Sequence, residues 1–147
     1  MMAQPADSDQ IPEPKRTLPV IDKDIEAYWT GGKNGELLIY RCQDCQYYVH
    51  PPVGFCPKCE SGDVIPEAVS GHGHVRSFAI NYKKWVPGLP DKYVMALVVI
   101  DEQDDVQLPC NIINCDPESV TMDMRVQVLF EQHEDLWIPL FEPETGQ

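Results

Sequence analysis

The chain has 147 residues, of which 43% are hydrophobic and 24% charged, a composition typical of a folded globular protein with one domain or two small ones. Its net charge is −13, and most of the excess lies in residues 101–147, where 12 acidic side chains accompany a single base, Arg125. Because nucleic acids and anionic membranes are bound by clustered Lys and Arg, this half of the chain argues against both kinds of partner.

The beginning of the chain shows no secretory signal, because residues 1–10 lack both a basic and an apolar segment. The longest apolar run, residues 94–100, is far shorter than the roughly 20 residues that span a bilayer. We therefore expect a cytoplasmic protein. In that compartment six cysteines indicate metal ligands or buried thiols rather than disulfides.

Residues 1–20 are expected to form a disordered arm. They show no apolar periodicity, and their prolines remove backbone donors and disfavour helix. A partner-binding tail is the alternative interpretation.

A short helix is predicted over residues 22–30, within an N-terminal segment spanning 21–35. Asp22 is the expected N-cap, and Gly31 and Gly32 are expected to end the helix. Its apolar side chains fall on one face: Ile21, Ile25, Tyr28 and Trp29. A helix this short is not stable alone in water, so this face must dock on the rest of the chain or on another subunit.

Beyond residue 35 the apolar period changes to two, which predicts short strands with almost no helix between them. A charged turn is expected at 101–105, and a turn or single helical turn at 116–122. Several short strands at this spacing are typical of a small barrel or sandwich. The predicted strands cover residues 36–41, 75–82, 94–100, 106–112, 126–130 and 136–141.

Two Cys-x-x-Cys pairs, Cys42 with Cys45 and Cys56 with Cys59, are separated by ten residues. Two residues between ligands let both thiolates of a pair face one metal ion, and four thiolates form the tetrahedron that zinc prefers in structural sites. All four positions are then filled by protein, so the metal should be structural rather than catalytic. Iron in a rubredoxin-like site, a redox dithiol and two disulfides are the alternatives.

The remaining cysteines and histidines show no ligand or nucleophile pattern. Cys110 lies in an alternating strand and is expected to be a buried core thiol. His50 could support the cysteine pairs from between them, but a hydrogen-bonded or solvated histidine is the default. Because the sequence shows no Ser/His/Asp grouping and no phosphate-binding loop, we expect no catalytic residues.

One stretch opposes the acidic background. Residues 76–92 include the bases Arg76, Lys83 and Lys84. Trp85 follows the two lysines in a loop, residues 83–92, that is otherwise largely apolar. Basic groups beside an aromatic surface would suit the phosphates, adenine and thioester arm of CoA. The alternative is an ordinary solvated hairpin tip, and Trp85 is also a candidate partner contact.

The joint pattern of these features resembles the zinc-ribbon/OB-fold family of acyl-CoA-associated proteins. The resemblance covers residues 20–143. It is carried by Tyr28-Trp29, Gly35-Glu36-Leu37, Arg41-Cys42 with Cys45, Pro51-Pro52, Cys56-Pro57 with Cys59, Ser70-Gly71 with Gly73, Val75 and Ser77-Phe78, residues 98–101, and Phe141 with Pro143.

The resemblance implies a mainly β protein with a short N-terminal helix (21–35), a rubredoxin-like zinc ribbon (36–67), a C-terminal five-stranded OB-fold barrel (68–143) and a tail (144–147). It also implies an accessory subunit that forms a hetero-oligomer with a thiolase-fold aldolase or thiolase, including the aldolases of steroid side-chain degradation. A hotdog-fold enoyl-CoA hydratase is the alternative partner.

Two positions depart from the family pattern. Gln46 stands where the family usually has Gly after the second cysteine, so the first knuckle should be strained or altered. Pro109 removes a ladder donor from its strand, which suits an edge or a bulge.

Two other functions compete with the accessory role. A barrel with a zinc ribbon can bind single-stranded nucleic acid, with Phe78, Tyr82 and Trp85 stacking on bases. A free-standing acyl-CoA-binding protein would need the CoA contacts but no partner enzyme.

Overall fold

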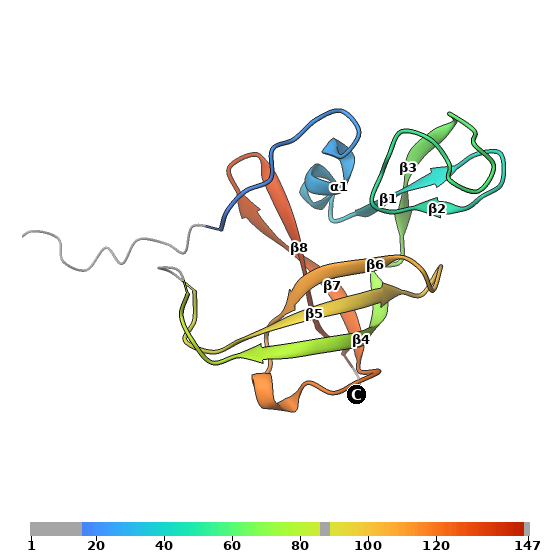
Figure 1. Ribbon diagram of the computed structural model, residues 1–147. Helices are drawn as coiled ribbons and strands as arrows, with labels where there is room; N and C mark the ends of the chain where they lie inside the picture. Colours follow the sequence, from blue (N-terminus) through green and yellow to red (C-terminus); the bar gives the residue numbers. More distant parts are fainter. Residues whose placement is uncertain (1–15, 86–88, 146–147) are drawn as a thin grey trace, which may run out of the picture.

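Three parts follow one another along the chain in the computed structural model, which describes residues 16–85 and 89–145 (Figure 1). They are a short helical segment, a three-stranded sheet and a closed five-stranded barrel. This mainly β architecture confirms the expected fold class. Of the predicted arm, residues 1–15 lie outside the described residues. Arg16 binds Glu131 through Nε (2.7 Å) and Asn111 through Nη1 (2.8 Å).

The helix α1 covers Glu26–Thr30 and begins later than predicted. Its N-cap is Ile25, which makes no side-chain capping bond, so the prediction of Asp22 was wrong. Asp22 instead closes the turn before the helix, where its carboxylate accepts from the backbone N–H of Asp24 at 2.9 Å and its carbonyl accepts from that of Glu26 at 3.1 Å.

The α-helix ends at Thr30 with Gly31 as its C-cap, as predicted, but the helical path does not end there. The chain continues as the 3₁₀ helix η1, Gly31–Asn34, and ends at Gly35, whose φ of 72° lies in the left-handed region that favours glycine. Gly32 is needed for close approach, because a Cβ there would lie 2.5 Å from Cδ1 of Phe130. The segment can therefore press against the barrel only with glycine at that position.

The ribbon sheet contains β1 (Leu37–Cys42), β2 (Tyr48–Val49) and β3 (Val64–Val69), with β1 in the centre. The strand expected at 36–41 is thus present as β1, whereas β2 and β3 were not predicted. β3 pairs antiparallel with β1 along the full register from Cys42↔Val64 to Leu37↔Val69. Its end leads directly into the first barrel strand.

The barrel closes in the order β4-β5-β6-β8-β7, and all its strands match predicted ones. All neighbours pair antiparallel except β6 and β8, which meet in parallel at Ile112↔Phe141. A single 3₁₀ turn, η2 (Pro117–Ser119), connects β6 to β7. The strands are β4 (His72–Asn81), β5 (Tyr93–Ile100), β6 (Gln107–Ile112), β7 (Arg125–His133) and β8 (Leu136–Pro143).

Pro109 does not lie on a true edge strand, because β6 stands between β5 and β8 in the closed barrel, but β6 is unpaired on one side around it. Pro109 lies opposite Leu97 of β5, and on its other side β6 pairs with β8 only at Ile112. The missing N–H therefore interrupts no continuous ladder on the open side of β6. The irregularity in the barrel lies elsewhere, between Val75 and Ser77 in β4.

One core joins the helix, part of the ribbon and the barrel. Tyr28 of α1 and Leu37 and Ile39 of β1 belong to the same buried cluster as the barrel residues Val75 and Phe141. Figure 1 shows α1 between the ribbon sheet and the β7–β8 hairpin. The apolar face of the helix therefore docks on its own chain. No helix among the described residues is long and apolar enough to cross a membrane.

Candidate metal centre and neighbouring surfaces

The two cysteine pairs come together at one end of the ribbon. Cys42 ends β1, and the Sγ atoms of all four cysteines lie within 4.8 Å of one another. The Sγ atoms of Cys42 and Cys59, and those of Cys45 and Cys56, are 3.5 Å apart. All four thiols are free, so neither disulfide of the alternative interpretation is present. Four sulfurs at the usual Zn–S distance of about 2.3 Å would lie about 3.8 Å from one another, so this set fits a zinc ion.

The two knuckles have the same backbone geometry. In the first, Gln46 N–H donates to the Cys42 carbonyl at 2.9 Å, and in the second Glu60 N–H donates to that of Cys56 at 2.8 Å. Gln46 has φ 66° and Glu60 φ 63°, both in the left-handed region. The prediction of a strained knuckle at Gln46 is therefore confirmed. The equivalent strain at Glu60 was missed, although its place directly after Cys59 is the signal that could have revealed it.

The protein backbone stabilises the thiolate form of Cys42. The Cys45 N–H points to the Cys42 sulfur at 3.5 Å, and this bond lowers the pKa of Cys42 to about 7. Cys42 and Cys56 are buried, whereas Cys45 and Cys59 are exposed at the surface. Because four protein thiolates complete a tetrahedron, the arrangement can hold a structural metal but presents no open position for substrate.

The residues predicted to bind CoA are only partly brought together. Lys83 Nζ lies 4.6 Å from the centre of the Trp85 ring, and the Trp85 indole donates to Asn81 Oδ1 at 3.1 Å. Lys84 is exposed beside them. Arg76 lies at the bulge of β4, seven residues before Lys83. In an extended strand that separation is roughly 20 Å, so Arg76 does not share a site with the lysines.

Acidic partners reduce the basic character of the same loop. Lys92 forms an ion pair with Glu118 at 2.5 Å, and the Tyr82 hydroxyl donates to that carboxylate at 2.7 Å. Residues 86–88, which carry part of the predicted apolar loop, lie outside the described residues. The cations that remain available for an anionic ligand here are therefore Lys83 and Lys84.

The histidines lie apart from the cysteine cluster. His50 packs against Tyr28 of α1, with ring centres 5.1 Å apart. His72 faces Glu144 at 3.3 Å, and His133 faces Glu131 at 2.5 Å. Cys110 packs against the core as expected, and its burial raises the pKa of its thiol to about 12, which makes it a poor nucleophile.

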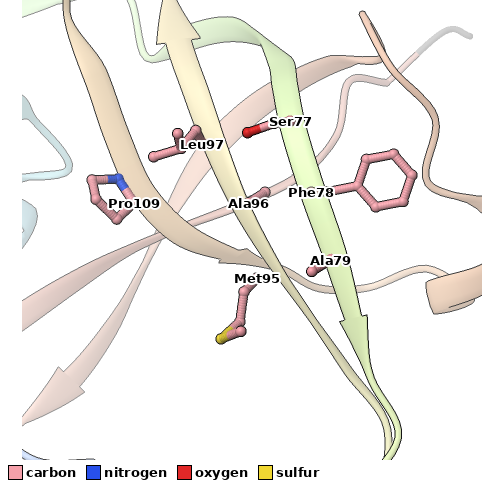
Figure 2. A pocket seen from close by; sticks show the side chains of 7 residues that line it. All are labelled: Ser77, Phe78, Ala79, Met95, Ala96, Leu97 and Pro109. Carbon is pink, nitrogen blue, oxygen red and sulfur yellow. The ribbon is translucent and has the colours of Figure 1, made fainter.

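The outer face of β4, β5 and β6 carries a shallow apolar hollow of about 350 Å³ (Figure 2). Figure 2 shows Met95, Leu97 and Pro109 on one side of the sheet and Phe78 pointing away from them. Met95 is 49% exposed, and Ala79 lies opposite it in the register. The signal for this surface was the unbroken apolar run of β5, which puts apolar side chains on the outside of the barrel as well as inside.

A second recess, of about 360 Å³, lies where the helix, the ribbon and the barrel meet. Pro109 borders both hollows, so the two form neighbouring parts of one uncharged surface. Sequence reasoning missed this recess, because its walls come from segments that are far apart in the chain. They are Pro19, Ile25, Tyr28, Trp29, His50, Pro51, Pro52 and Pro109.

Comparison with known families identifies both β parts of the chain. Residues 29–64 match the rubredoxin-like zinc ribbon domain of ChsH2, and residues 66–131 match the C-terminal OB-fold domain of ChsH2. This chain belongs to the ChsH2 family of zinc-ribbon/OB-fold proteins. The knuckles with the four cysteines lie inside the first match and most of the barrel inside the second.

Two hydratase alpha subunits are similar to this chain over most of its length. It is 30% identical over 141 residues to a probable enoyl-CoA hydratase alpha subunit of Thermomonospora curvata (95% of this chain, 44% of that one). It is 30% identical over 126 residues to the 3-oxo-4,17-pregnadiene-20-carboxyl-CoA hydratase alpha subunit of Mycobacterium tuberculosis (86% and 40%). The chain thus spans less than half the length of these two relatives.

Two other similar proteins are matched over most of their own length. A DUF35 domain-containing scaffold protein of Methanocaldococcus jannaschii is 28% identical over 119 residues, which cover 76% of this chain and 79% of that one. A chain in the solved structure of the Ltp2-ChsH2(DUF35) aldolase superposes with a TM-score of 0.78 and 29% identity, over 86% of this chain and 98% of that chain.

Proposed function

We propose that this protein is an accessory subunit that holds one structural zinc ion and binds an enzyme acting on acyl-CoA thioesters. The observation that carries the proposal is the similarity to the chain of the Ltp2-ChsH2(DUF35) aldolase, which extends over the ribbon and the barrel together. The description of the Methanocaldococcus jannaschii relative as a scaffold protein supports the same role. The set of four cysteine thiolates, which leaves no open position on a metal, also favours a structural role for the metal.

The proposed partner is a thiolase-fold aldolase or thiolase, which breaks or forms a carbon–carbon bond on the CoA thioester. The name of the Mycobacterium tuberculosis relative includes a pregnadiene-carboxyl-CoA, which favours a steroid side chain as the acyl group. A second candidate partner is an enoyl-CoA hydratase, since two relatives are described as hydratase alpha subunits. In both cases the protein works in a hetero-oligomer.

The experiment that tests the accessory role is capture of the tagged full-length protein from its native host, followed by mass spectrometry. Recovery of a thiolase-fold enzyme in near-stoichiometric amount is expected, and a hydratase in that amount would favour the second candidate. Recovery of no enzyme would contradict the accessory role and favour a free-standing acyl-CoA-binding protein. Recovery of nucleic acid, bound with an affinity that falls steeply as salt rises, would favour a protein that binds single-stranded nucleic acid.

Three matched variants locate the partner contact. Trp85→Ala changes the exposed hairpin tip (65% exposed), and Met95→Lys places a charge in the hollow of Figure 2. Ile65→Lys is the control, because Ile65 is similarly exposed (45%) but lies on β3 of the ribbon. We expect the first two variants to lose partner recovery and the control to retain it.

We also propose that Lys83, Lys84 and Trp85 contact the phosphates and adenine of a CoA thioester. The exposure of both lysines and the position of one over the indole support this assignment. Replacing both lysines by Ala should weaken CoA-thioester binding to the isolated protein about tenfold or more, measured by calorimetry. Unchanged affinity would contradict it, and Lys23→Ala/Lys33→Ala is a control with the same charge change.

A further inference from the structure

The recess between the helix, the ribbon and the barrel contains two polar groups that the protein itself does not satisfy. Tyr28 is 8% exposed, and neither its hydroxyl nor the His50 ring forms a hydrogen bond within the described residues. Tyr28 is buried and His50 half-buried, so their polar atoms are left to bond with whatever occupies the recess.

These polar groups are accessible from the recess. Among the described residues, no atom of Tyr28 or His50 is a completely enclosed side-chain oxygen or nitrogen that lacks a hydrogen bond. The Tyr28 hydroxyl and the His50 nitrogens must therefore keep some accessible surface. Because both residues line the recess, a molecule within it can reach them.

The walls of the recess select against charged ligands. None of the described residues that line it is acidic, Lys or Arg, and most are proline or aromatic. Burial also lowers the pKa of His50 to about 4, so its imidazole is neutral near pH 7. A carboxylate or phosphate would lose its hydration here without meeting a cation.

The polar groups select for a ligand that both donates and accepts hydrogen bonds. A neutral imidazole offers one donor and one acceptor, and a phenolic hydroxyl can do either. An amide has a carbonyl and an N–H on adjacent atoms and can satisfy both residues at once. The volume of about 360 Å³ lies at the lower end of the range for small-molecule pockets, which suits a body of one or two rings.

We propose that this recess is a binding site for an uncharged ligand with an apolar body of one or two rings and an amide group. The apolar body would lie against Trp29 and the prolines, and the amide would bond to Tyr28 and His50. This inference is independent of the proposed partner enzyme, since it rests only on the walls of the recess.

The test uses three probes of nearly the same shape on the full-length, zinc-loaded protein: benzamide, benzoate and toluene. Binding is followed by shifts of the backbone amide signals of Tyr28, Trp29 and His50 in ¹H–¹⁵N spectra. We expect benzamide to bind about three- to tenfold more tightly than toluene, because of its hydrogen bonds, and benzoate to bind at least about tenfold more weakly than benzamide. Equal binding of benzoate and benzamide, or no shift of these signals, would overturn the proposal.

Two variants assign the hydrogen bonds. Tyr28→Phe keeps the ring that packs on Trp29 and removes only the hydroxyl. This variant should therefore bind benzamide no more tightly than toluene, as a purely apolar pocket would. His50→Phe tests the second bond in the same way and serves if the first variant does not fold. Tyr82→Phe is the matched control, because Tyr82 is exposed on the distant hairpin. An unchanged preference for benzamide in both recess variants would refute the assignment.

Discussion

The ribbon and the barrel are held together by different means. The barrel contributes most of a large apolar cluster, in which Val75, Val98 and Phe141 are fully buried. The cysteine end of the ribbon has a separate cluster whose buried members are only Cys42, Val49 and Cys56. Two of these three residues belong to the thiolate set. A core of this size cannot offset the conformational entropy of folding, so we expect a metal bound by the four cysteines to supply the difference.

The boundary between the two regions runs along a single strand. Leu37 and Ile39, at the start of β1, are buried in the barrel's cluster, whereas Cys42, at its end, belongs to the metal cluster. One strand thus takes part in an apolar core and in a metal site. Folding of the knuckles should therefore depend on the metal, whereas folding of the barrel should not.

The largest expected effect comes from Cys42→Ser, which tests whether metal dependence is confined in this way. Loss of one thiolate should release zinc and disorder the knuckles, because structural zinc contributes about 10–16 kcal/mol in small zinc domains. The barrel should remain folded, and the partner should be lost together with the metal. Zinc content by elemental analysis and amide spectra of both regions would show this.

Cys115→Ser is the matched control for that variant, since Cys115 is a free, partly buried thiol outside the ribbon. Full zinc occupancy in Cys42→Ser would contradict the assignment of the ligands. Collapse of the barrel signals along with those of the knuckles would contradict the confinement.

The converse experiment is Phe141→Ala, which removes a fully buried ring from β8. It should lower the free energy of unfolding by about 3–5 kcal/mol. Zinc should remain bound in native buffer, because the thiolate set is untouched. Urea unfolding with zinc present measures the loss, and Met122→Ala, at a site that is 57% exposed, should change stability by less than about 0.5 kcal/mol. Zinc loss from Phe141→Ala before unfolding would show that the two regions are not separate.

An acid titration probes the junction between the regions through His50. Burial lowers its pKa to about 4, below its ordinary value of 6.5. Between these values the unfolded chain binds a proton that the folded chain does not, so stability is complete above pH 6.5 and falls toward pH 4. The loss is at most about 3 kcal/mol.

His50→Phe keeps a ring at this position and should remove that part of the pH dependence. Because acid also protonates zinc-bound thiolates, both proteins are compared at equal zinc content. The same pH dependence in the variant and the original protein would show that His50 does not carry the effect.

The smallest expected effect concerns backbone strain in the two knuckles. Gln46→Gly and Glu60→Gly each place glycine at a positive φ, which relieves backbone strain but increases the entropy of the unfolded chain. We expect a gain of up to about 1 kcal/mol in the stability of the zinc-loaded ribbon. Gly62→Ala leaves both positive-φ positions unchanged and is a control for glycine content. A loss of stability in both knuckle variants would show that these positions are not strained.

How far the sequence predicts the fold depends on how regularly each segment buries its side chains. β6 and β7 were predicted because Leu108 and Cys110, or Val126 and Val128, recur with a period of two, and β5 was predicted from its unbroken apolar run. β3 was missed, since it contains Pro66 and buries no side chain completely. β2 has only two residues, too few to show any period.

The metal site and the recess differ in whether a local sequence pattern reveals them. The four ligands were found because each pair is defined by a spacing of three along the chain. The helix start was placed at Asp22 because an acidic side chain is a common N-cap, whereas the observed cap is Ile25, which makes no side-chain capping bond. The recess has no local signal, since Tyr28, His50 and Pro109 meet only after folding.

The sequence by itself determined the thiolate set, the alternation of the barrel strands and the family resemblance, because these depend on residue types at short separations. Only the tertiary structure decided that the helix docks on its own barrel, that Arg76 lies apart from Lys83, and that an uncharged recess opens beside Pro109. The docked helix and the recess depend on the closure of the barrel and on the pairing of β1 with β3, which bring distant segments together through burial of apolar surface. The separation of Arg76 from Lys83 follows from the extended conformation of β4.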